Sequence, residues 1–328
     1  MTKIFVTRDI PDAGLKMLRK RKDVRLSVYK ENKKIPRKEL LHRVKGVDII
    51  LSLLTERMDK QVFDAAGPKL KMVANYAVGF NNVDVEEAKK RGLVVTNTPS
   101  VEVAETVAEH AVALIFALSH RLIEVDKFTR AGKYHGWGPK MFLGTDVVGK
   151  TLGVIGGGLI GTNLIRRMHD GFGLKILYND IKQNPELEKK YNAQYRSKMQ
   201  LLKQSDFVSL HVPLLPTTYH LISTAELKAM KKTAFLINTA RGPVIDELAL
   251  TKALENGQIA GAGLDVYECE PAIDCDLSDT HELRKLDNVI LTPHTASATI
   301  EARQAMSIVT ADNIIAFLNK KKIPNQVN

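Results

Sequence analysis

Polar side chains that a hydrophobic core would exclude follow three strand-like segments in the second half of the chain. The segments are INTARGPV at 237–244, GAGLDVYECEP at 261–271 and LTPHTASAT at 291–299, and they contain Arg241, Glu270 and His294. A guanidinium keeps its charge at any working pH and can bond two oxygens at once, whereas an imidazole can donate or accept a proton near neutrality. Ligands of open parallel sheets bind beyond the carboxyl ends of the strands. This set could therefore bind a small acid and exchange a proton with it.

The segment TLGVIGGGLIG at 151–161 predicts a turn that binds a dinucleotide. A hydrophobic strand enters the pattern Gly156-x-Gly158-x-x-Gly161, and the amphipathic stretch NLIRRMHDGFG follows it. Glycine allows the tight turn, the close approach of a pyrophosphate and the close packing of helix on strand, while the start of the helix offers unpaired N–H groups to the anion. A plain tight turn is the alternative.

Asp180 extends this signature, because the segment KILYND places it 24 residues after Gly156, near the usual spacing of the acidic residue. A carboxylate there accepts hydrogen bonds from both hydroxyls of the adenosine ribose and repels a 2'-phosphate. We therefore predict NAD as the cofactor in preference to NADP. Two alternatives stay open. The positive charge of Lys182 lies close enough to weaken the preference for NAD over NADP, and Asp180 could simply begin the NDIKQNP loop.

Strand-like and helix-like segments alternate along the chain and predict an α/β fold with two doubly wound parallel sheets. The first series has strand-like runs at 3–8, 24–29, 47–53, 70–76 and 93–98; the second contains TLGVIG, KILYND, FVSLHV, AFLINTA, IAGAGLDVY and NVILTPH. The stretch 101–131 has no glycine or proline and has apolar residues at helical spacing, so we expect one long helix between the series.

No strand-like segment follows the last helical stretch, 299–319. We therefore expect this helix to pack against the first unit. This assigns residues 1–99 and 296–328 to a discontinuous first domain. Residues 100–295, with the long helix and the glycine turn, form the second, inserted domain.

Composition excludes several classes of protein. The 328 residues are 44% hydrophobic and 26% charged, as in an ordinary globular protein, and the net charge of +11 comes from scattered lysines. We expect a solvated basic surface, with the attraction of anionic substrate and dinucleotide as the alternative, and no nucleic-acid partner. There is no apolar run long enough for a membrane span and no signal-like amino terminus, so a cytoplasmic protein is expected. Cys269 and Cys275 fit neither a CxxC pair nor a ligand set, which predicts two reduced thiols and no structural zinc.

Taken together and in this order, the motifs resemble the D-isomer-specific 2-hydroxyacid dehydrogenase family over nearly the whole chain. Three segments, LSLLTERMD at 51–59, ANYAVGFNNVDVEEAKKRGLVVTNTP at 74–99 and MFLGTDVVGKTLGVIG at 141–156, are similar to the glyoxylate and hydroxypyruvate reductases of that family. The resemblance implies a flavodoxin-like substrate domain, an inserted Rossmann domain that binds NAD, and a homodimer joined around the long helix. It also implies hydride transfer between NAD(H) and a small 2-keto or D-2-hydroxy acid, with no metal.

The family pattern gives each of the three polar residues a role. Arg241 would bind the substrate carboxylate and the C2 oxygen, and His294 would be the general acid and base. Glu270 would hydrogen-bond the imidazole and fix its tautomer, with Glu268 as the competitor for that position. Without the family pattern, Arg241 could pair with a surface carboxylate and His294 could be a packed core histidine.

Further site residues follow from positions that match the family. The N–H groups of Val78 and Gly79 would bind the substrate carboxylate, with a plain strand-to-helix turn as the alternative. Leu53 would shape the pocket, and Trp137 would either reach the partner subunit's pocket or pack in a core or interface. Leu159 departs from the polar residue common after the second glycine, which leaves the pyrophosphate to backbone N–H groups. Asp265 would lie at the nicotinamide side of the cofactor pocket, or it could only cap a loop. The expected cofactor contacts are Thr106, Gly156, Gly158, Leu159, Ile160, Gly161, Asp180, Val212, Pro213, Thr218, Thr239, Ala240, Asp265, His294 and Ala296.

Other functions remain as alternatives. A D-lactate or other D-2-hydroxyacid dehydrogenase would use the same residues, and so could an NAD-sensing corepressor or scaffold, although such regulators are expected to have long disordered tails, which this chain lacks. The L-hydroxyacid dehydrogenases have an amino-terminal glycine turn, whereas a complete α/β unit precedes the turn here.

Overall fold

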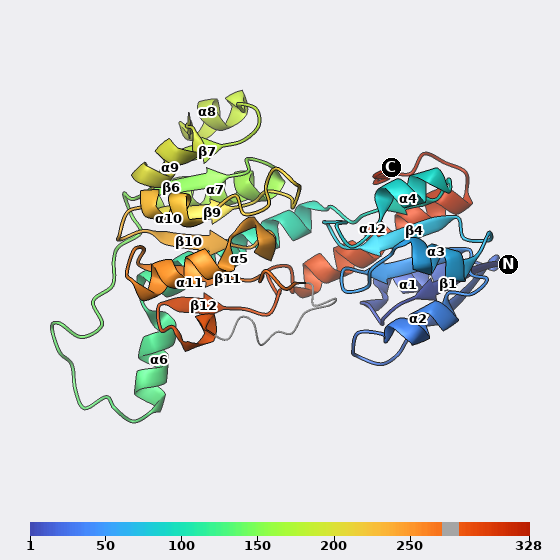
Figure 1. Cartoon of the computed structure of the whole chain (residues 1–328), viewed down its shortest axis with the longest axis horizontal. Helices are drawn as coiled ribbons and strands as arrows, with labels where there is room; N and C mark the ends of the chain where they lie inside the picture. Colours follow the sequence, from blue (N-terminus) through green and yellow to red (C-terminus); the bar gives the residue numbers. More distant parts are fainter. Residues whose placement is uncertain (271–281) are drawn as a thin grey trace. The chain divides into compact units, whose positions relative to one another are not determined.

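The chain forms two compact units, which are described separately. The computed structural model describes residues 1–270 and 282–328 (Figure 1). Unit 1 comprises residues 1–103 and 298–328, and unit 2 comprises residues 104–297.

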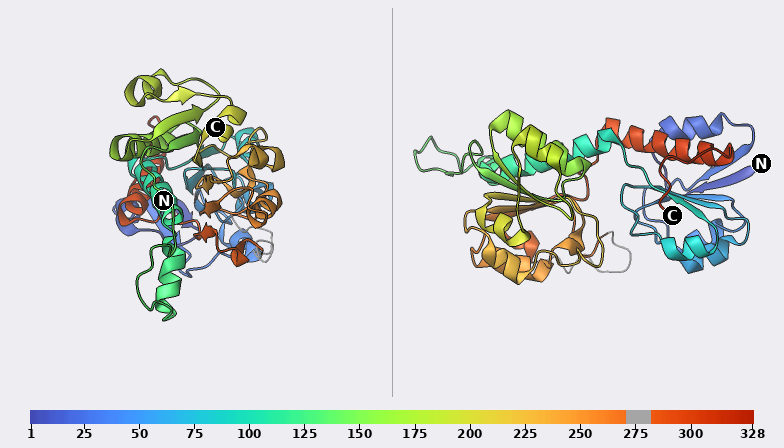
Figure 2. Two further views of the ribbon diagram at one scale, coloured as in Figure 1. Left: turned by 90° about the vertical axis from the view of Figure 1, so that its left-hand side faces the viewer. Right: turned by 90° about the horizontal axis from the view of Figure 1, so that it is seen from above.

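Unit 1 is a five-stranded parallel sheet with the strand order β2-β1-β3-β4-β5. Each strand is a short, largely β-branched or aliphatic run, and β4 is buried along its whole length, as expected of a parallel strand covered on both faces. Helices α1 and α12 cover one face, and α2, α3 and α4 cover the other (Figure 2). The strands are β1 (Thr2–Val6), β2 (Val24–Val28), β3 (Ile49–Leu53), β4 (Met72–Tyr76) and β5 (Val94–Thr96), and the helices are α1 (Asp12–Arg19), α2 (Arg37–Arg43), α3 (Lys60–Ala66), α4 (Val85–Lys90) and α12 (Ile300–Leu318).

Helix α12, from the end of the chain, packs closely against α1. A Cβ atom on Gly14 would lie 1.9 Å from the Ser307 carbonyl oxygen, so only glycine permits this approach. The Ser307 hydroxyl accepts a hydrogen bond from the Gly14 amide (3.0 Å) and donates one to the Pro11 carbonyl (2.5 Å). The two ends of the chain therefore complete the same unit.

Unit 2 is a seven-stranded parallel sheet with the order β12-β11-β10-β9-β6-β7-β8. Apolar side chains of α5, α7 and α8 pack on one face, and those of α9, α10 and α11 pack on the other (Figure 2). The strand order reverses at β6, which is the switch point where open α/β sheets bind ligands. The strands are β6 (Thr151–Ile155), β7 (Lys175–Asn179), β8 (Gln194–Tyr195), β9 (Phe207–Leu210), β10 (Phe235–Asn238), β11 (Gly261–Leu264) and β12 (Val289–Leu291), and the helices are α5 (Val101–Ser119), α6 (Leu122–Arg130), α7 (Leu159–Phe172), α8 (Pro185–Tyr191), α9 (Lys198–Gln204), α10 (Thr224–Ala229) and α11 (Glu247–Glu255).

These two sheets confirm the predicted fold class, but the predicted single helix over 101–131 is wrong. Helix α5 ends at Ser119, and α6 begins at Leu122 after Arg121 adopts a left-handed conformation with φ of 53°. The Arg121 guanidinium bonds both carboxylate oxygens of Glu124 at 2.8 Å, which stabilises the break. Helix α6 has no buried residue. We call residues 121–148, which contain α6 and the irregular segment after it, the arm.

Two further expectations concern membranes and cysteines. Within the described residues, no helix combines the length and apolar character of a membrane span. Cys269 is disulfide-bonded, so the prediction of a reduced thiol is wrong at this position. Cys275 lies outside the described residues.

Candidate active site

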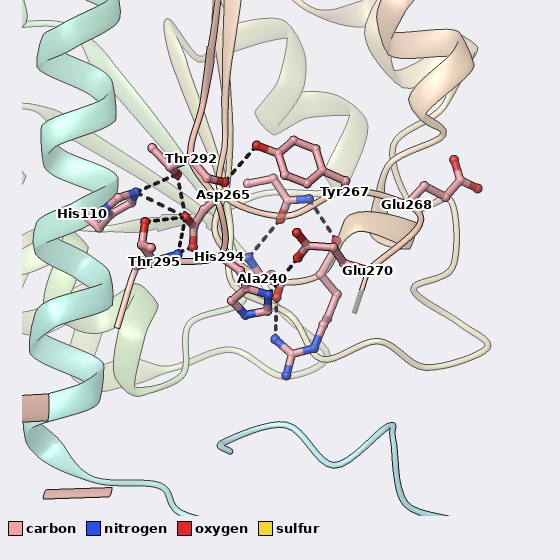
Figure 3. A network of polar contacts seen from close by, with 12 residues as sticks. His110, Ala240, Asp265, Tyr267, Glu268, Glu270, Thr292, His294 and Thr295 are labelled. Carbon is pink, nitrogen blue, oxygen red and sulfur yellow. Dashed lines mark hydrogen bonds and ion pairs between the residues drawn. The ribbon is translucent and has the colours of Figure 1, made fainter. Parts of the chain in front are cut away.

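The three polar segments meet because β10, β11 and β12 are neighbours in the sheet of unit 2 and end at the same edge. Arg241 lies shortly after β10, Asp265 directly follows β11, and His294 lies shortly after β12. Figure 3 shows the resulting network of polar contacts.

His294 and Glu270 form the contact most relevant to proton transfer. The imidazole Nδ1 lies 2.8 Å from Glu270 Oε2, and the side chains are 24% and 14% exposed. An ionised carboxylate at this distance accepts the Nδ1 hydrogen, which leaves Nε2 as the nitrogen that can exchange a proton with a ligand. The Glu270 amide in turn donates to the Tyr267 carbonyl at 3.0 Å.

Glu268, the competitor for this role, is occupied elsewhere. Its Oε1 lies 2.7 Å from His220 Nε2, and its Oε2 accepts a hydrogen bond from the Glu247 amide at 3.2 Å. Its side chain is directed away from His294, whereas that of Glu270 faces the imidazole (Figure 3).

Asp265 is fully buried and holds the loop that carries His294. Its Oδ1 accepts from the Thr292 hydroxyl (2.5 Å) and the Thr295 amide (2.8 Å), and its Oδ2 accepts from the Ala296 amide (2.8 Å). The His294 amide donates to the Asp265 carbonyl at 2.9 Å. These bonds stabilise His294 in a left-handed conformation, with φ of 54°, that residues other than glycine adopt rarely.

His110 also joins this network, although sequence reasoning missed it. Its Nε2 lies 3.1 Å from the Thr292 hydroxyl and 3.6 Å from Asp265 Oδ1 (Figure 3). It lies on α5 one helical turn after Thr106, a predicted cofactor residue. The i, i+4 spacing was a signal that could have found it.

Arg241 is half-buried in the turn after β10. Its Nη1 donates to the Ala240 carbonyl at 2.7 Å, and Asn238 Nδ2 donates to the Arg241 carbonyl at 2.9 Å. Burial lowers the pKa of Arg241 from its ordinary value, and the nearby Glu270 carboxylate opposes this. The guanidinium starts from so high a value that it stays charged.

Gly242 allows this turn to approach the Glu270 loop. A Cβ atom on Gly242 would lie 1.6 Å from the Tyr267 carbonyl oxygen, so a side chain at this position would separate the two segments. The glycine therefore lets the Arg241 turn and the Glu270 loop lie in contact.

The three glycines of the dinucleotide motif meet three different requirements. Gly156 has φ of 100°, and a Cβ there would lie 2.5 Å from the His211 carbonyl oxygen; a Cβ on Gly161 would lie 2.1 Å from the Gly156 carbonyl oxygen. A Cβ on Gly158 would meet nothing within 4 Å, which leaves open space at the start of α7. Close packing on one side and open space at a helix amino terminus fit a bound pyrophosphate.

Asp180 lies directly against the glycine turn. Its Oδ2 accepts a hydrogen bond from the Gly157 amide at 2.7 Å, and its Oδ1 accepts one from the Ile181 amide at 2.6 Å. The carboxylate thus lies against the glycine turn, and the neighbouring Lys182 is exposed.

The loop after β9 contains His211, which sequence reasoning also missed. Its Nε2 lies 2.8 Å from the Ser209 hydroxyl, and its Nδ1 has no partner among the described residues. Burial lowers the pKa of His211 to about 4, so the ring beside the glycine turn is neutral. Its position immediately before the predicted contacts Val212 and Pro213 was the available signal.

The remaining predicted residues divide between the units. In unit 2, Thr239 is buried and its hydroxyl has no partner among the described residues, the Thr218 hydroxyl donates to the Pro213 carbonyl at 2.6 Å, and Leu159 is 64% exposed. Trp137, on the arm, is 82% exposed, so the fold of unit 2 alone does not bury it. In unit 1, Leu53 ends β3, and Val78 and Gly79 follow β4.

Comparisons with known proteins show the family and the fold class. Residues 112–296 match the model of the D-isomer specific 2-hydroxyacid dehydrogenase, NAD binding domain. The chain is 49% identical to a glyoxylate reductase of Thermococcus kodakarensis over 99% of this chain and 96% of the relative. It also resembles the crystal structure of a glyoxylate reductase from Paecilomyes thermophila, with a TM-score of 0.86, 32% identity and 99% and 98% of the two chains covered. The crystal structure of D-lactate dehydrogenase from Aquifex aeolicus complexed with NAD and lactic acid gives a TM-score of 0.85 at 30% identity, with 99% of both chains covered.

Proposed function

We propose that this chain, which belongs to the D-isomer specific 2-hydroxyacid dehydrogenase family, reduces glyoxylate and hydroxypyruvate with NADH. It is an NAD-dependent oxidoreductase that acts on small 2-keto and D-2-hydroxy acids. The observation that carries the proposal is the 2.8 Å contact between His294 Nδ1 and Glu270 Oε2 at the sheet edge that also carries Arg241.

In this proposal the residues of the chain bind the acid and move one proton. NADH, when bound, supplies the hydride to the C2 carbon. Arg241 binds the substrate carboxylate and the C2 oxygen with its guanidinium. His294 donates its Nε2 proton to the C2 oxygen, and Glu270 stabilises the ring in the orientation and charge that this transfer needs. Glyoxylate then leaves as glycolate, and hydroxypyruvate leaves as D-glycerate.

The choice of substrate rests on similarity, because the curated relative at 49% identity is a glyoxylate reductase, whereas the D-lactate dehydrogenase is 30% identical. The test is a steady-state comparison of glyoxylate, hydroxypyruvate and pyruvate with NADH. We expect kcat/KM to be highest for the first two. A higher value for pyruvate would indicate a D-lactate dehydrogenase. No turnover with any 2-keto acid would favour the corepressor or scaffold.

Preference for NADH over NADPH is assigned to Asp180, supported by its hydrogen bond from Gly157. Asp180→Ala is expected to lower the ratio of kcat/KM with NADH to that with NADPH. The neighbouring Lys182→Ala serves as the control and is expected to raise the ratio or leave it unchanged. An unchanged ratio in Asp180→Ala would refute the ribose assignment.

We also propose that the protein is a homodimer joined by the arm and works in the cytoplasm. Leu122, Ile123, Trp137 and Leu143 are exposed on the arm, and a hollow of about 560 Å³ lies at its base. A second copy would bury this apolar surface. Leu143→Asp is expected to yield monomers in sedimentation analysis, whereas Leu248→Asp, at an equally exposed site on α11, should not. A dimer that survives Leu143→Asp would place the interface elsewhere, and cell fractionation tests the location.

A further inference from the structure

We propose that Asn75 and Asn97 are positioning residues that orient the turn Ala77–Phe80 to bind the carboxylate of the substrate. The inference rests on the proposed function, because it concerns the binding of the same acid. The two asparagines belong to unit 1, and their role, the orientation of this turn, differs from that of the catalytic residues of unit 2. The two side chains act through the backbone of the turn.

Each of three successive carbonyl groups of the turn accepts a hydrogen bond. The Thr98 amide donates to the Ala77 carbonyl at 2.9 Å, Asn97 Nδ2 donates to the Val78 carbonyl at 2.7 Å, and Asn75 Nδ2 donates to the Gly79 carbonyl at 3.1 Å. Thr98 and Asn75 are buried, so the Ala77 and Gly79 carbonyls point into the unit.

The orientation of each carbonyl fixes the orientation of the next amide. In a planar trans peptide the C=O and N–H bonds point in opposite directions. The three held carbonyls therefore turn the N–H groups of Val78, Gly79 and Phe80 away from the residues that hold them. None of these three amides has an acceptor among the described residues, and Val78 and Phe80 are exposed. Successive free N–H groups at a turn form an anion-binding concavity.

A buried cluster of side-chain amides keeps Asn75 in place. Asn75 and Asn82 are 0% and 4% exposed, and each donates an Nδ2 hydrogen to the Oδ1 of the other at 3.1 Å. The Ser52 hydroxyl donates to Asn75 Oδ1 at 3.0 Å. Every donor and acceptor of the Asn75 side chain thus has a partner, which leaves it a single orientation.

The same cluster fixes the end of β3. Asn82 Nδ2 also donates to the Leu53 carbonyl at 3.0 Å and to the Glu56 carbonyl at 3.1 Å. One group of neutral side chains therefore couples the turn after β4 to Leu53, the residue expected to shape the pocket.

Asparagine suits this place for two reasons. A carboxylate in place of Asn75 would present oxygens to the Gly79 carbonyl and to Asn82 Oδ1, and would add a negative charge beneath a site for an anion. An apolar side chain would leave buried carbonyls without donors, which is costly. A neutral amide supplies the donors without repelling the substrate.

The main variant is Asn97→Ala, because Asn97 lies near the surface and loses one hydrogen bond to the backbone. We expect KM for glyoxylate and the inhibition constant of oxamate to rise about fivefold, with kcat and the NADH dissociation constant nearly unchanged. Thr310→Ala is the matched control, since it also removes one hydrogen bond from a side chain to a carbonyl in unit 1, at 2.8 Å, on α12. It should lower stability and leave KM as in the wild type.

Asn75→Asp is the second variant, with a larger expected rise in KM. If it fails to fold, Asn97→Ala still decides the question. Equal KM values in Asn97→Ala, Thr310→Ala and the wild type would overturn the inference. If the wild type reduces no 2-keto acid, the proposed function fails separately, and the inference is then decided by NMR. Oxamate added with NADH should shift the amide signals of Val78, Gly79 and Phe80 in the wild type and much less in Asn97→Ala; no shift in the wild type would overturn it.

Discussion

Two backbone segments that follow parallel strands are held in opposite ways. In unit 1, neutral amide side chains hold the turn Ala77–Phe80, with Asn75 and Asn97 as donors to its carbonyls. In unit 2, the buried carboxylate of Asp265 holds the loop of His294 by accepting hydrogen bonds from its amides. One support bonds carbonyls and leaves N–H groups available, and the other bonds N–H groups.

The difference follows the charge that each segment is proposed to meet. A neutral support beneath N–H donors does not oppose an anionic carboxylate. The segment of unit 2 carries the imidazole that is proposed to donate a proton, and Glu270 contacts that ring at 2.8 Å from Nδ1. The loop after β9 resembles the unit 1 turn only in that its partly buried ring, His211, is neutral. In the two segments compared, the charge of the support therefore differs as the charge of the proposed ligand group does.

The strongest test of the comparison between the turn of unit 1 and the loop of unit 2 is to remove the imidazole of His294. His294→Ala is expected to lower kcat for glyoxylate reduction by about 10²- to 10⁴-fold, because general acid catalysis is lost. NADH should still bind, as followed by the fluorescence of the nicotinamide. A variant with near-normal kcat would rule out the role in proton transfer.

The neutrality of His211 predicts a pH dependence of stability. Its pKa is about 4 in the folded chain and 6.5 for the unperturbed group, so between these values the unfolded chain takes up a proton that the folded chain does not. The free energy of unfolding should therefore fall as the pH drops from about 6.5 to 4, by up to about 3 kcal/mol from this residue.

Denaturant unfolding of the wild type and His211→Gln at pH 7 and pH 4.5 measures this effect. The wild type should lose more stability than the variant over that interval. Equal losses would mean that the ring is protonated in the folded chain and that the parallel with unit 1 does not hold.

Asp265→Asn changes the charge of the support while keeping its shape. An amide can replace one carboxylate oxygen, but its NH2 group must face a donor, either the Thr295 or the Ala296 amide. We expect the free energy of unfolding to fall by about 1–3 kcal/mol, together with a lower kcat. Thr292→Val removes a single hydroxyl donor to the same carboxylate and should have the smaller effect. Full stability in Asp265→Asn would show that the loop does not depend on an anionic support.

The smallest effect is expected for the contact between Glu268 and His220, both of which are about one-third exposed. Exposed pairs contribute about 0–1 kcal/mol, so Glu268→Gln should change stability and kcat little. Glu270→Gln should lower kcat clearly, because its carboxylate bonds His294. Equal losses in both variants would contradict the distinction between the two acids.

The sequence was sufficient for the fold class because alternating apolar runs and amphipathic stretches define parallel sheets without further information. The glycine motif could also be identified from the sequence alone, since the spacing of its glycines follows from the backbone of one turn. The break between α5 and α6 was missed because its left-handed residue is Arg121, whereas sequence reasoning expects glycine or asparagine there.

The residues that hold these two segments, Asp265, Asn75 and Asn97, were harder to predict than the candidate catalytic residues. Asp265 was expected either at the nicotinamide side of the cofactor pocket or as the cap of a loop; its carboxylate bonds the loop of His294, and the contact with the cofactor stays a prediction. Asn75 and Asn97 carried no prediction, because the direction of a side-chain amide depends on partners far apart in sequence. Spacing can place a residue at a sheet edge, but it cannot say which carbonyl that residue will bond. The roles of Arg241, Glu270 and His294 stay predictions, of which His294→Ala and Glu270→Gln test the last two.

The packing of α12 on α1 imposes an order on folding during synthesis. Unit 2 is continuous in sequence, so its segments are all synthesised before α12 is made. The five strands of unit 1 precede unit 2, yet the sheet face that α12 covers stays bare until synthesis has passed through unit 2. Unit 1 is thus begun before unit 2 and completed after it.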